Sequence, residues 1–150
     1  MLDRTAFQDL PLPDTTQGDP RLTGVEIEFA GLDEVTTAQL VADVFGGQIE
    51  EDGAYDRTVR GTSLGDIKVE LDTALRKVKG VPLLEEGLSL ARGLVPVEIV
   101  TPPLSMDGIV QFNGFLSVLR DAGALGSRAG LLLGFGVHLN PEVVGPDHPH

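Results

Sequence analysis

The stretch TGVEIEFAG, residues 23–31, decides the fold because its apolar and acidic residues alternate. Successive side chains of a β-strand point to opposite faces, so the valine, isoleucine and phenylalanine share one face while Glu26 and Glu28 share the other. The apolar face requires cover from another layer of the protein. The stretch therefore predicts a strand of a half-covered sheet, and it leaves two readings of the carboxylates open: an ordinary solvated surface or part of a metal site.

The same alternation recurs in three later stretches, DIKVELD at 66–72, PVEIVT at 96–101 and FGVHLN at 135–140. Each separates into an apolar and a polar face, as strands of a sheet with one covered face do. If these strands are neighbours, their polar residues gather on one face. The residues predicted there are Glu26, Glu28, Glu70, Asp72, Glu98, His138 and Asn140.

Two stretches between the strands have the spacing of amphipathic helices. The first, DEVTTAQLVADVFGG, is expected to have Thr36 or Thr37 as its cap and to stop at its two glycines, and the second spans 107–122. A shorter helix is expected to begin at Pro82. The apolar face of the first helix is predicted to comprise Val35, Leu40, Val41, Val44 and Phe45. Hairpins alternating with helices predict an α+β fold, with a mostly antiparallel sheet and helices packed on one face.

The chain has 150 residues, of which 41% are hydrophobic, and this is the size of one ordinary domain. Residues 1–21 are rich in proline, glycine and aspartate, so we expect a turn-rich leader ahead of a domain at 22–150. The leader lacks the apolar segment of a signal peptide, and no stretch is apolar over the length of a membrane span. We therefore expect a cytoplasmic protein without a membrane partner.

The net charge is −12, from 23 acidic residues against 11 lysines and arginines. Such a charge repels phosphate backbones, so nucleic acid is not an expected partner, whereas cations are attracted. The absence of cysteine excludes disulfides, thiolate chemistry and zinc sites of the cysteine type. Net charge alone does not show whether the acidic residues bind cations or only keep the protein soluble. Their positions in the fold decide between these roles.

The predicted polar face has the chemistry of a site for hard cations. Carboxylates with one imidazole suit Mg²⁺ or Mn²⁺ better than zinc or copper. The alternative is a solvated face on which Lys68 neutralises some of the acids. Glu98 favours the metal site, because it stands in the otherwise apolar stretch VPVEIVTPPL, where a charge needs a partner.

Four motifs in order, GVEIEF, LGDIKVELD, VEIVTPPL and GFGVHLNPE, resemble the amidoligase family, a branch of the carboxylate–amine ligases. The resemblance covers about residues 22–142, and EIVTPP and G-x-H-x-N are its more specific parts. It implies a glutamine synthetase-like catalytic fold. It also implies that ATP, with Mg²⁺ or Mn²⁺, activates a small-molecule or peptide carboxylate as an acyl phosphate, which an amine then attacks.

The resemblance implies a role for each matching residue. The implied metal ligands are Glu26, Glu28, Glu98 and His138, and the histidine is the one that binds the metal next to the ATP phosphates. The implied catalytic residues are Asp72, which corresponds to the acid that contacts the amine or acceptor, and Asn140, a looser match near the same pocket.

Members of the family extend past the histidine strand, and that second half supplies arginines that hold ATP. This chain has no lysine or arginine beyond Arg128. We therefore expect residues 22–150 to be the N-terminal part of an amidoligase-like catalytic domain, apparently truncated, which acts with a missing C-terminal half or as an oligomer. Two functions stay open: an ATP-dependent ligase, complete or not, and a non-catalytic metal-binding or assembly remnant of one. A glycosidase is a weaker third alternative, because the chain has one tyrosine and no tryptophan for stacking sugars.

Overall fold

The computed structural model describes residues 4–71, 96–126 and 136–145. Within these ranges the strands form one six-stranded sheet in the order β2-β3-β4-β5-β1-β6, and every neighbouring pair is antiparallel. The strands are β1 (Thr23–Phe29), β2 (Gln48–Gly53), β3 (Asp56–Thr62), β4 (Gly65–Leu71), β5 (Val97–Val100) and β6 (Val137–Pro141). The helices are α1 (Glu34–Phe45), α4 (Met106–Asp121) and the short 3-10 helix η1 (Arg4–Ala6).

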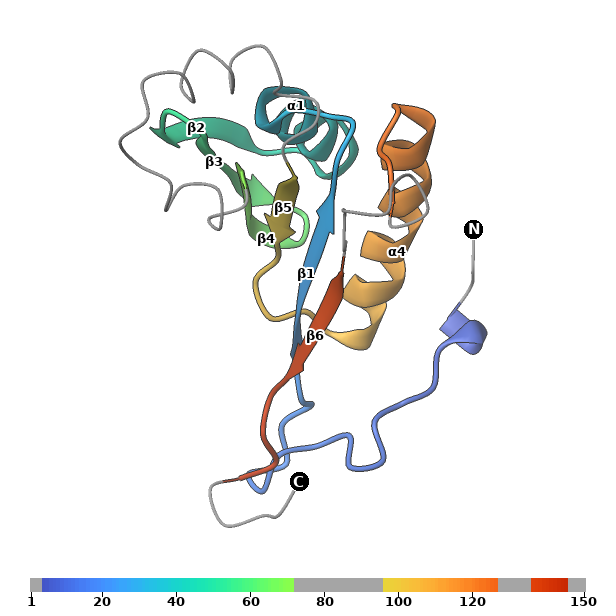
Figure 1. The fold of residues 1–150 in the computed structure, drawn as a ribbon. Helices are drawn as coiled ribbons and strands as arrows, with labels where there is room; N and C mark the ends of the chain where they lie inside the picture. The colour runs from blue at the N-terminus through green and yellow to red at the C-terminus, as the bar shows by residue number, and fades with distance from the viewer. Residues whose placement is uncertain (1–3, 72–95, 127–135, 146–150) are drawn as a thin grey trace, which may run out of the picture.

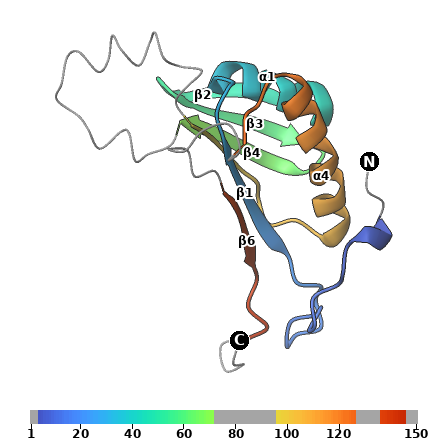
Figure 2. The ribbon, with the colours of Figure 1, turned by 45° about the vertical axis from the view of Figure 1, so that its right-hand side comes forward.

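Both α1 and α4 lie on the same side of the sheet, as two views of the ribbon show (Figures 1 and 2). This arrangement confirms the predicted α+β class with helices on one face. The strand alternation is confirmed as well. Every second residue of β1 is buried from Thr23 to Phe29, and the two glutamates between these buried residues are half-buried. The same pattern buries Val97 and Ile99 of β5 beneath the helices.

Helix α1 begins one turn earlier than predicted. Its N-cap is Asp33, whose carboxylate accepts a hydrogen bond of 2.7 Å from the backbone N–H of Thr36, so the prediction of a threonine cap was wrong. A short carboxylate at this position binds an N–H of the first turn that has no partner inside the helix. The stop at Gly46 is confirmed, where the backbone takes a φ of 74° that favours glycine.

The buried face of α1 is also rotated from the predicted one. Val35 and Val44 are 46% and 45% exposed, whereas Glu34 and Thr37 are completely buried. Arg57 of β3 explains the inward glutamate, because its guanidinium lies 3.9 Å from the Glu34 carboxylate on the covered side of the sheet. The ion pair between Arg57 and Glu34 thus contributes more to the orientation of the helix than its apolar pattern does.

Helix α4 lies close to its predicted position and is capped by Ser105, whose hydroxyl accepts a hydrogen bond from the N–H of Gly108. It joins α1 through a cluster of aromatic rings. Phe45 of α1 stands 5.3 Å from Phe115 and 6.3 Å from Phe112, measured between ring centroids. Edge-to-face and offset ring pairs of this kind hold two helices together over the sheet. No helix among the described residues has the length and apolarity to cross a membrane.

The leader that was predicted to be rich in turns contains η1 and a bridge between Asp14 and Pro20. Its far end contacts the chain just beyond β6, because Arg21 donates a hydrogen bond of 2.6 Å to the backbone oxygen of Glu142. Arg21 also donates a hydrogen bond of 2.7 Å to the backbone oxygen of Leu12 within the leader. The helix predicted from Pro82, and the catalytic residue predicted at Asp72, lie outside the described residues.

Candidate functional site: the polar face of the sheet

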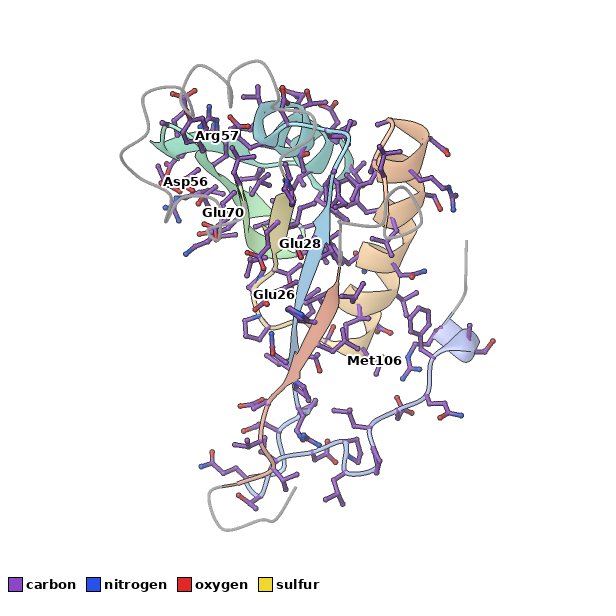
Figure 3. All side chains as sticks on the ribbon, viewed as in Figure 1. Glu26, Glu28, Asp56, Arg57, Glu70 and Met106 are labelled. Atoms are coloured by element: carbon purple, nitrogen blue, oxygen red, sulfur yellow. The ribbon has the colours of Figure 1, made fainter. Side chains whose placement is uncertain are left out.

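The sheet register lines up carboxylates across four neighbouring strands. Glu28 of β1 is opposite Glu98 of β5, Glu98 is opposite Glu70 of β4, and Glu70 is opposite Asp56 of β3. We name these four residues the acidic row. Figure 3 shows Glu28, Glu70 and Asp56 in succession from β1 toward β2, with Glu26 next to Glu28 along β1. Like charges directly opposite one another destabilise a sheet unless a positive group lies near them.

A second group forms one step along β1, where Glu26 meets two side chains of β6. Its Oε2 atom lies 3.3 Å from Nδ1 of His138, and its Oε1 atom accepts a hydrogen bond of 3.0 Å from the amide of Asn140. Residues Glu26 and His138 are cross-strand partners, which explains their contact. We name these three residues the Glu26 cluster. The His138 side chain is 66% exposed and that of Glu26 is 32% exposed, so solvent and solutes reach both.

The two groups are neighbours on one surface. Glu26 and Glu28 are two residues apart on the same face of β1, a spacing of about 6.6 Å. The solvated-face alternative requires Lys68 to neutralise some of these acids. Lys68 of β4 is opposite Val100 of β5, and Val100 therefore lies between Lys68 and Glu26 in the register. Among the described residues Lys68 forms no ion pair, so it does not neutralise this part of the face.

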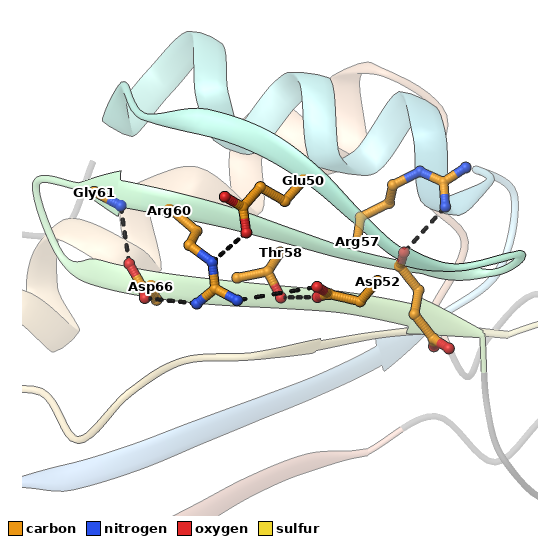
Figure 4. Close-up of polar contacts among 8 residues, drawn as sticks. Glu50, Asp52, Arg57, Thr58, Arg60, Gly61 and Asp66 are labelled. Carbon is orange, nitrogen blue, oxygen red and sulfur yellow. Dashed lines mark hydrogen bonds and ion pairs between the residues drawn. The ribbon is translucent and has the colours of Figure 1, made fainter.

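Elsewhere on the polar face, around Arg60 of β3, the acidic residues Glu50, Asp52 and Asp66 are neutralised. Arg60 of β3 forms ion pairs with Glu50, with Asp66 at 3.0 Å and with Asp52 at 3.9 Å (Figure 4). Thr58 donates its hydroxyl to Asp52 in the same network. This part of the face is therefore an ordinary charged surface of the kind that the solvated-face reading predicts.

Two pKa values reflect this network. Hydrogen bonding to Glu50, and then to Asp66, raises the pKa of Arg60 above its usual value. The pKa of Asp66 is lowered, chiefly because its carboxylate accepts a hydrogen bond from the N–H of Gly61 and also one from Arg60. Both shifts favour the charged forms, so the network keeps its ion pairs at neutral pH.

Strands β1, β5 and β6 contain no lysine or arginine at all. Their polar face presents Glu26, Glu28 and Glu98 with a single imidazole, and carboxylate oxygens are the ligands that Mg²⁺ and Mn²⁺ prefer. This donor set fits such an ion chemically. In the present arrangement of the described side chains, however, no group of three or more histidine or acidic residues is close enough to hold one.

The structure thus brings together part of the predicted site. It joins Glu26, His138 and Asn140 in one contact cluster and places Glu28 opposite Glu98, while Asp72 lies outside the described residues. Asp56 was not among the predicted residues of this face. Strand alternation alone assigns it to a face, but only the β3–β4 register aligns it with Glu70.

Comparison with known proteins supports the resemblance seen in the motifs. The family model described as "Putative amidoligase enzyme" matches residues 19–148, and so contains all five strands that supply the acidic row and the Glu26 cluster. Searches of curated proteins and of solved structures found no significant match. Because the family match spans most of the chain, the protein belongs to the amidoligase family of ligase-type enzymes.

Proposed function

We propose that the protein is an ATP-dependent carboxylate–amine ligase that acts through an acyl phosphate, on a sheet of the glutamine synthetase-like type. Its substrates are a small-molecule or peptide carboxylate and an amine. The observation that carries the proposal is the placement of acidic residues on the polar face. In a member of the amidoligase family, Glu28 lies opposite Glu98 on this face, and Glu26 beside them contacts His138.

A divalent cation would offset the mutual repulsion of these facing carboxylates. We assign Glu26, Glu28, Glu98 and His138 as its ligands, and the opposed positions of Glu28 and Glu98 make these two carboxylates its natural pair. When bound, Mg²⁺ or Mn²⁺ would offset the repulsion between the triphosphate and the substrate carboxylate. Strand positions give the ligands the rigidity that such a site needs.

Asn140 acts beside the cation as a positioning residue. Its amide nitrogen donates to Oε1 of Glu26, while Nδ1 of His138 meets Oε2, so the two β6 side chains hold both oxygens of one carboxylate. Hydrogen bonds to a ligating carboxylate orient it and typically contribute 10–100-fold to metal affinity. Asp72 is proposed to contact the amine or acceptor, as its position in the family motif implies.

The test measures cation binding and turnover separately. Mn²⁺ binding is followed by electron paramagnetic resonance, with and without ATP, and ADP release is followed with amino-acid acceptors. We expect wild type to bind Mn²⁺, and Glu28→Gln and Glu98→Gln each to weaken binding at least about tenfold. Glu51→Gln is the matched control, because it makes the same chemical change on β2 at a side chain that is 77% exposed.

Three results are informative. Loss of ADP release in Glu28→Gln, with full release in Glu51→Gln, supports the ligase. Unchanged Mn²⁺ binding in both Glu28→Gln and Glu98→Gln would overturn the metal assignment. Binding without any ADP release would instead favour the second candidate, a non-catalytic binding or assembly module. Strand β6 also favours it, because its sequence VHLNP has no acidic or basic residue apart from one histidine.

A further inference from the structure

The two outer strands of the sheet differ in chemistry. Strand β2 carries Glu50, Glu51 and Asp52 and has an irregular register with β3 between Glu51 and Gly53. Charges and bulges on an edge strand are common devices that prevent pairing with another chain. Strand β6, of sequence VHLNP, has no acidic or basic residue apart from one histidine. In the described part of the chain, β6 pairs with β1 alone.

Within the residues that the structure describes, the backbone groups of β6 that point away from β1 belong to two residues with both an N–H and a C=O. The N–H of Glu28 donates to the Gly136 oxygen at 3.0 Å, and the N–H of Glu142 donates to the Leu22 oxygen at 2.8 Å. Because antiparallel strands alternate inward and outward backbone groups, the even-numbered residues of β6 bond to β1. Val137 and Leu139 consequently turn their N–H and C=O groups to the outer edge.

The same two residues expose apolar side chains on the helix side of the sheet. Val137 is 62% exposed and Leu139 is 59% exposed. They form one wall of a groove of about 440 Å³ between β6 and α4, whose other wall includes Ile109 and Leu116. None of the residues that line this groove is charged, although the chain has a net charge of −12.

We propose that the outer edge of β6 pairs with the β6 edge of a second copy of this chain. Two antiparallel registers pair the outward groups. In one, Val137 bonds to Leu139 of the second copy; in the other, Leu139 bonds to its own equivalent and Val137 is opposite Pro141, which accepts a hydrogen bond but has no N–H to donate. In both, apolar side chains meet apolar side chains beside the groove. A second copy is the favoured occupant because this edge and groove carry no acid, so two strongly negative chains can meet here without direct repulsion.

Pairing would also extend the Glu26 cluster. In the two registers, His138 stands opposite either His138 or Asn140 of the second copy, at the short cross-strand separation of about 4.5–5.5 Å. The second copy would therefore contribute a ring nitrogen or an amide beside the Glu26 contact. A five-residue strand and part of a groove form a small interface, so we expect weak, concentration-dependent association.

Sedimentation velocity between about 10 µM and about 1 mM tests the pairing directly and needs no substrate. We expect wild type to move from monomer toward dimer across this range, and Leu139→Lys to remain monomeric at every concentration. Val44→Lys is the matched control, because Val44 is 45% exposed on α1, away from the β6 edge. This variant should dimerise like wild type. Circular dichroism checks that all three chains are folded.

Amide hydrogen exchange adds a second readout. The N–H groups of Val137 and Leu139 should exchange more slowly as protein concentration rises, whereas those of β2 should not change. Wild type that stays monomeric at about 1 mM would overturn the proposal and leave the edge to another polypeptide. Association that persists unchanged in Leu139→Lys, or that protects the amides of β2 instead, would also overturn it.

Discussion

Arg57 of β3 lies 3.9 Å from the carboxylate of Glu34, and both side chains are enclosed, at 9% and 0% exposure. The pair connects the first turn of α1 to the covered face of the sheet. Arg57 also donates hydrogen bonds of 3.0 Å to the backbone oxygens of Gly53 and Asp56, and approaches Glu51 at 3.6 Å. One guanidinium therefore links the helix, the strand and the β2–β3 turn.

Replacement of Arg57 by methionine should lower the free energy of unfolding by about 3–5 kcal/mol, because it leaves the buried Glu34 carboxylate without its cation. Urea unfolding at neutral pH measures the change. The double variant Arg57→Met, Glu34→Leu should recover most of the loss, since no buried charge then remains. A cost below about 1 kcal/mol in the single variant would show that Glu34 does not depend on Arg57.

Thr37→Val should stabilise the protein. The Thr37 side chain is completely buried, and among the described residues its hydroxyl has no hydrogen-bond partner. Exchanging an unsatisfied hydroxyl for a methyl group of similar size should raise the free energy of unfolding by about 1 kcal/mol. Thr36→Val is the control, because Thr36 is exposed on the same turn and its replacement should have little effect. Destabilisation by Thr37→Val would reveal a hydrogen bond to that hydroxyl.

Asp66→Asn should destabilise the protein at neutral pH but not at low pH. The folded state lowers the pKa of Asp66 below its ordinary 3.8, so the charged carboxylate stabilises the fold above that value. The contribution is lost as pH falls through the lowered folded-state pKa, since the group is then protonated in both states. Thermal unfolding of the two proteins should differ at pH 7 and converge toward pH 2. A constant difference across this range would contradict the Gly61 and Arg60 contacts as its cause.

Glu98→Gln should have opposite effects with and without divalent cations. In EDTA it should raise the midpoint of thermal unfolding, because it removes like-charge repulsion with Glu28 and Glu70, an effect of about 0.2–1 kcal/mol. In excess Mg²⁺ wild type should gain stability by ligand binding, and the variant should gain much less. Equal gains in both proteins would place the cation elsewhere, and Glu51→Gln should gain as much as wild type.

The fold was predictable where a period of two residues is strong. The alternation in β1 and β5 identified the covered face residue by residue, since a strand has no other way to bury Val25 or Ile99. The orientation of α1 was not predictable. Val35 and Val44 fit an apolar helical face, but the position of Arg57 is set by long-range pairing that no local pattern contains.

The shared face of the candidate residues could be predicted from the sequence, but their arrangement on that face could not. Glu26, Glu28, Glu98 and His138 were assigned to one face from strand parity and family motifs. Their partners depend on strand order, and β1, first in the chain, lies between β5 and β6, the last two strands. That order alone places Glu28 opposite Glu98 and Glu26 opposite His138.

The contrast between the charged β2 edge and the uncharged β6 edge sets a limit on assembly. Two copies joined through β6 about a two-fold axis would leave their two β2 edges as the outer edges of the described sheet, each with Glu50, Glu51 and Asp52. Charged side chains and the irregular β2–β3 register on those edges disfavour further strand pairing, so we do not expect the sheet of two copies to grow into a fibre. The β2 edge would thereby limit assembly by strand pairing to two copies.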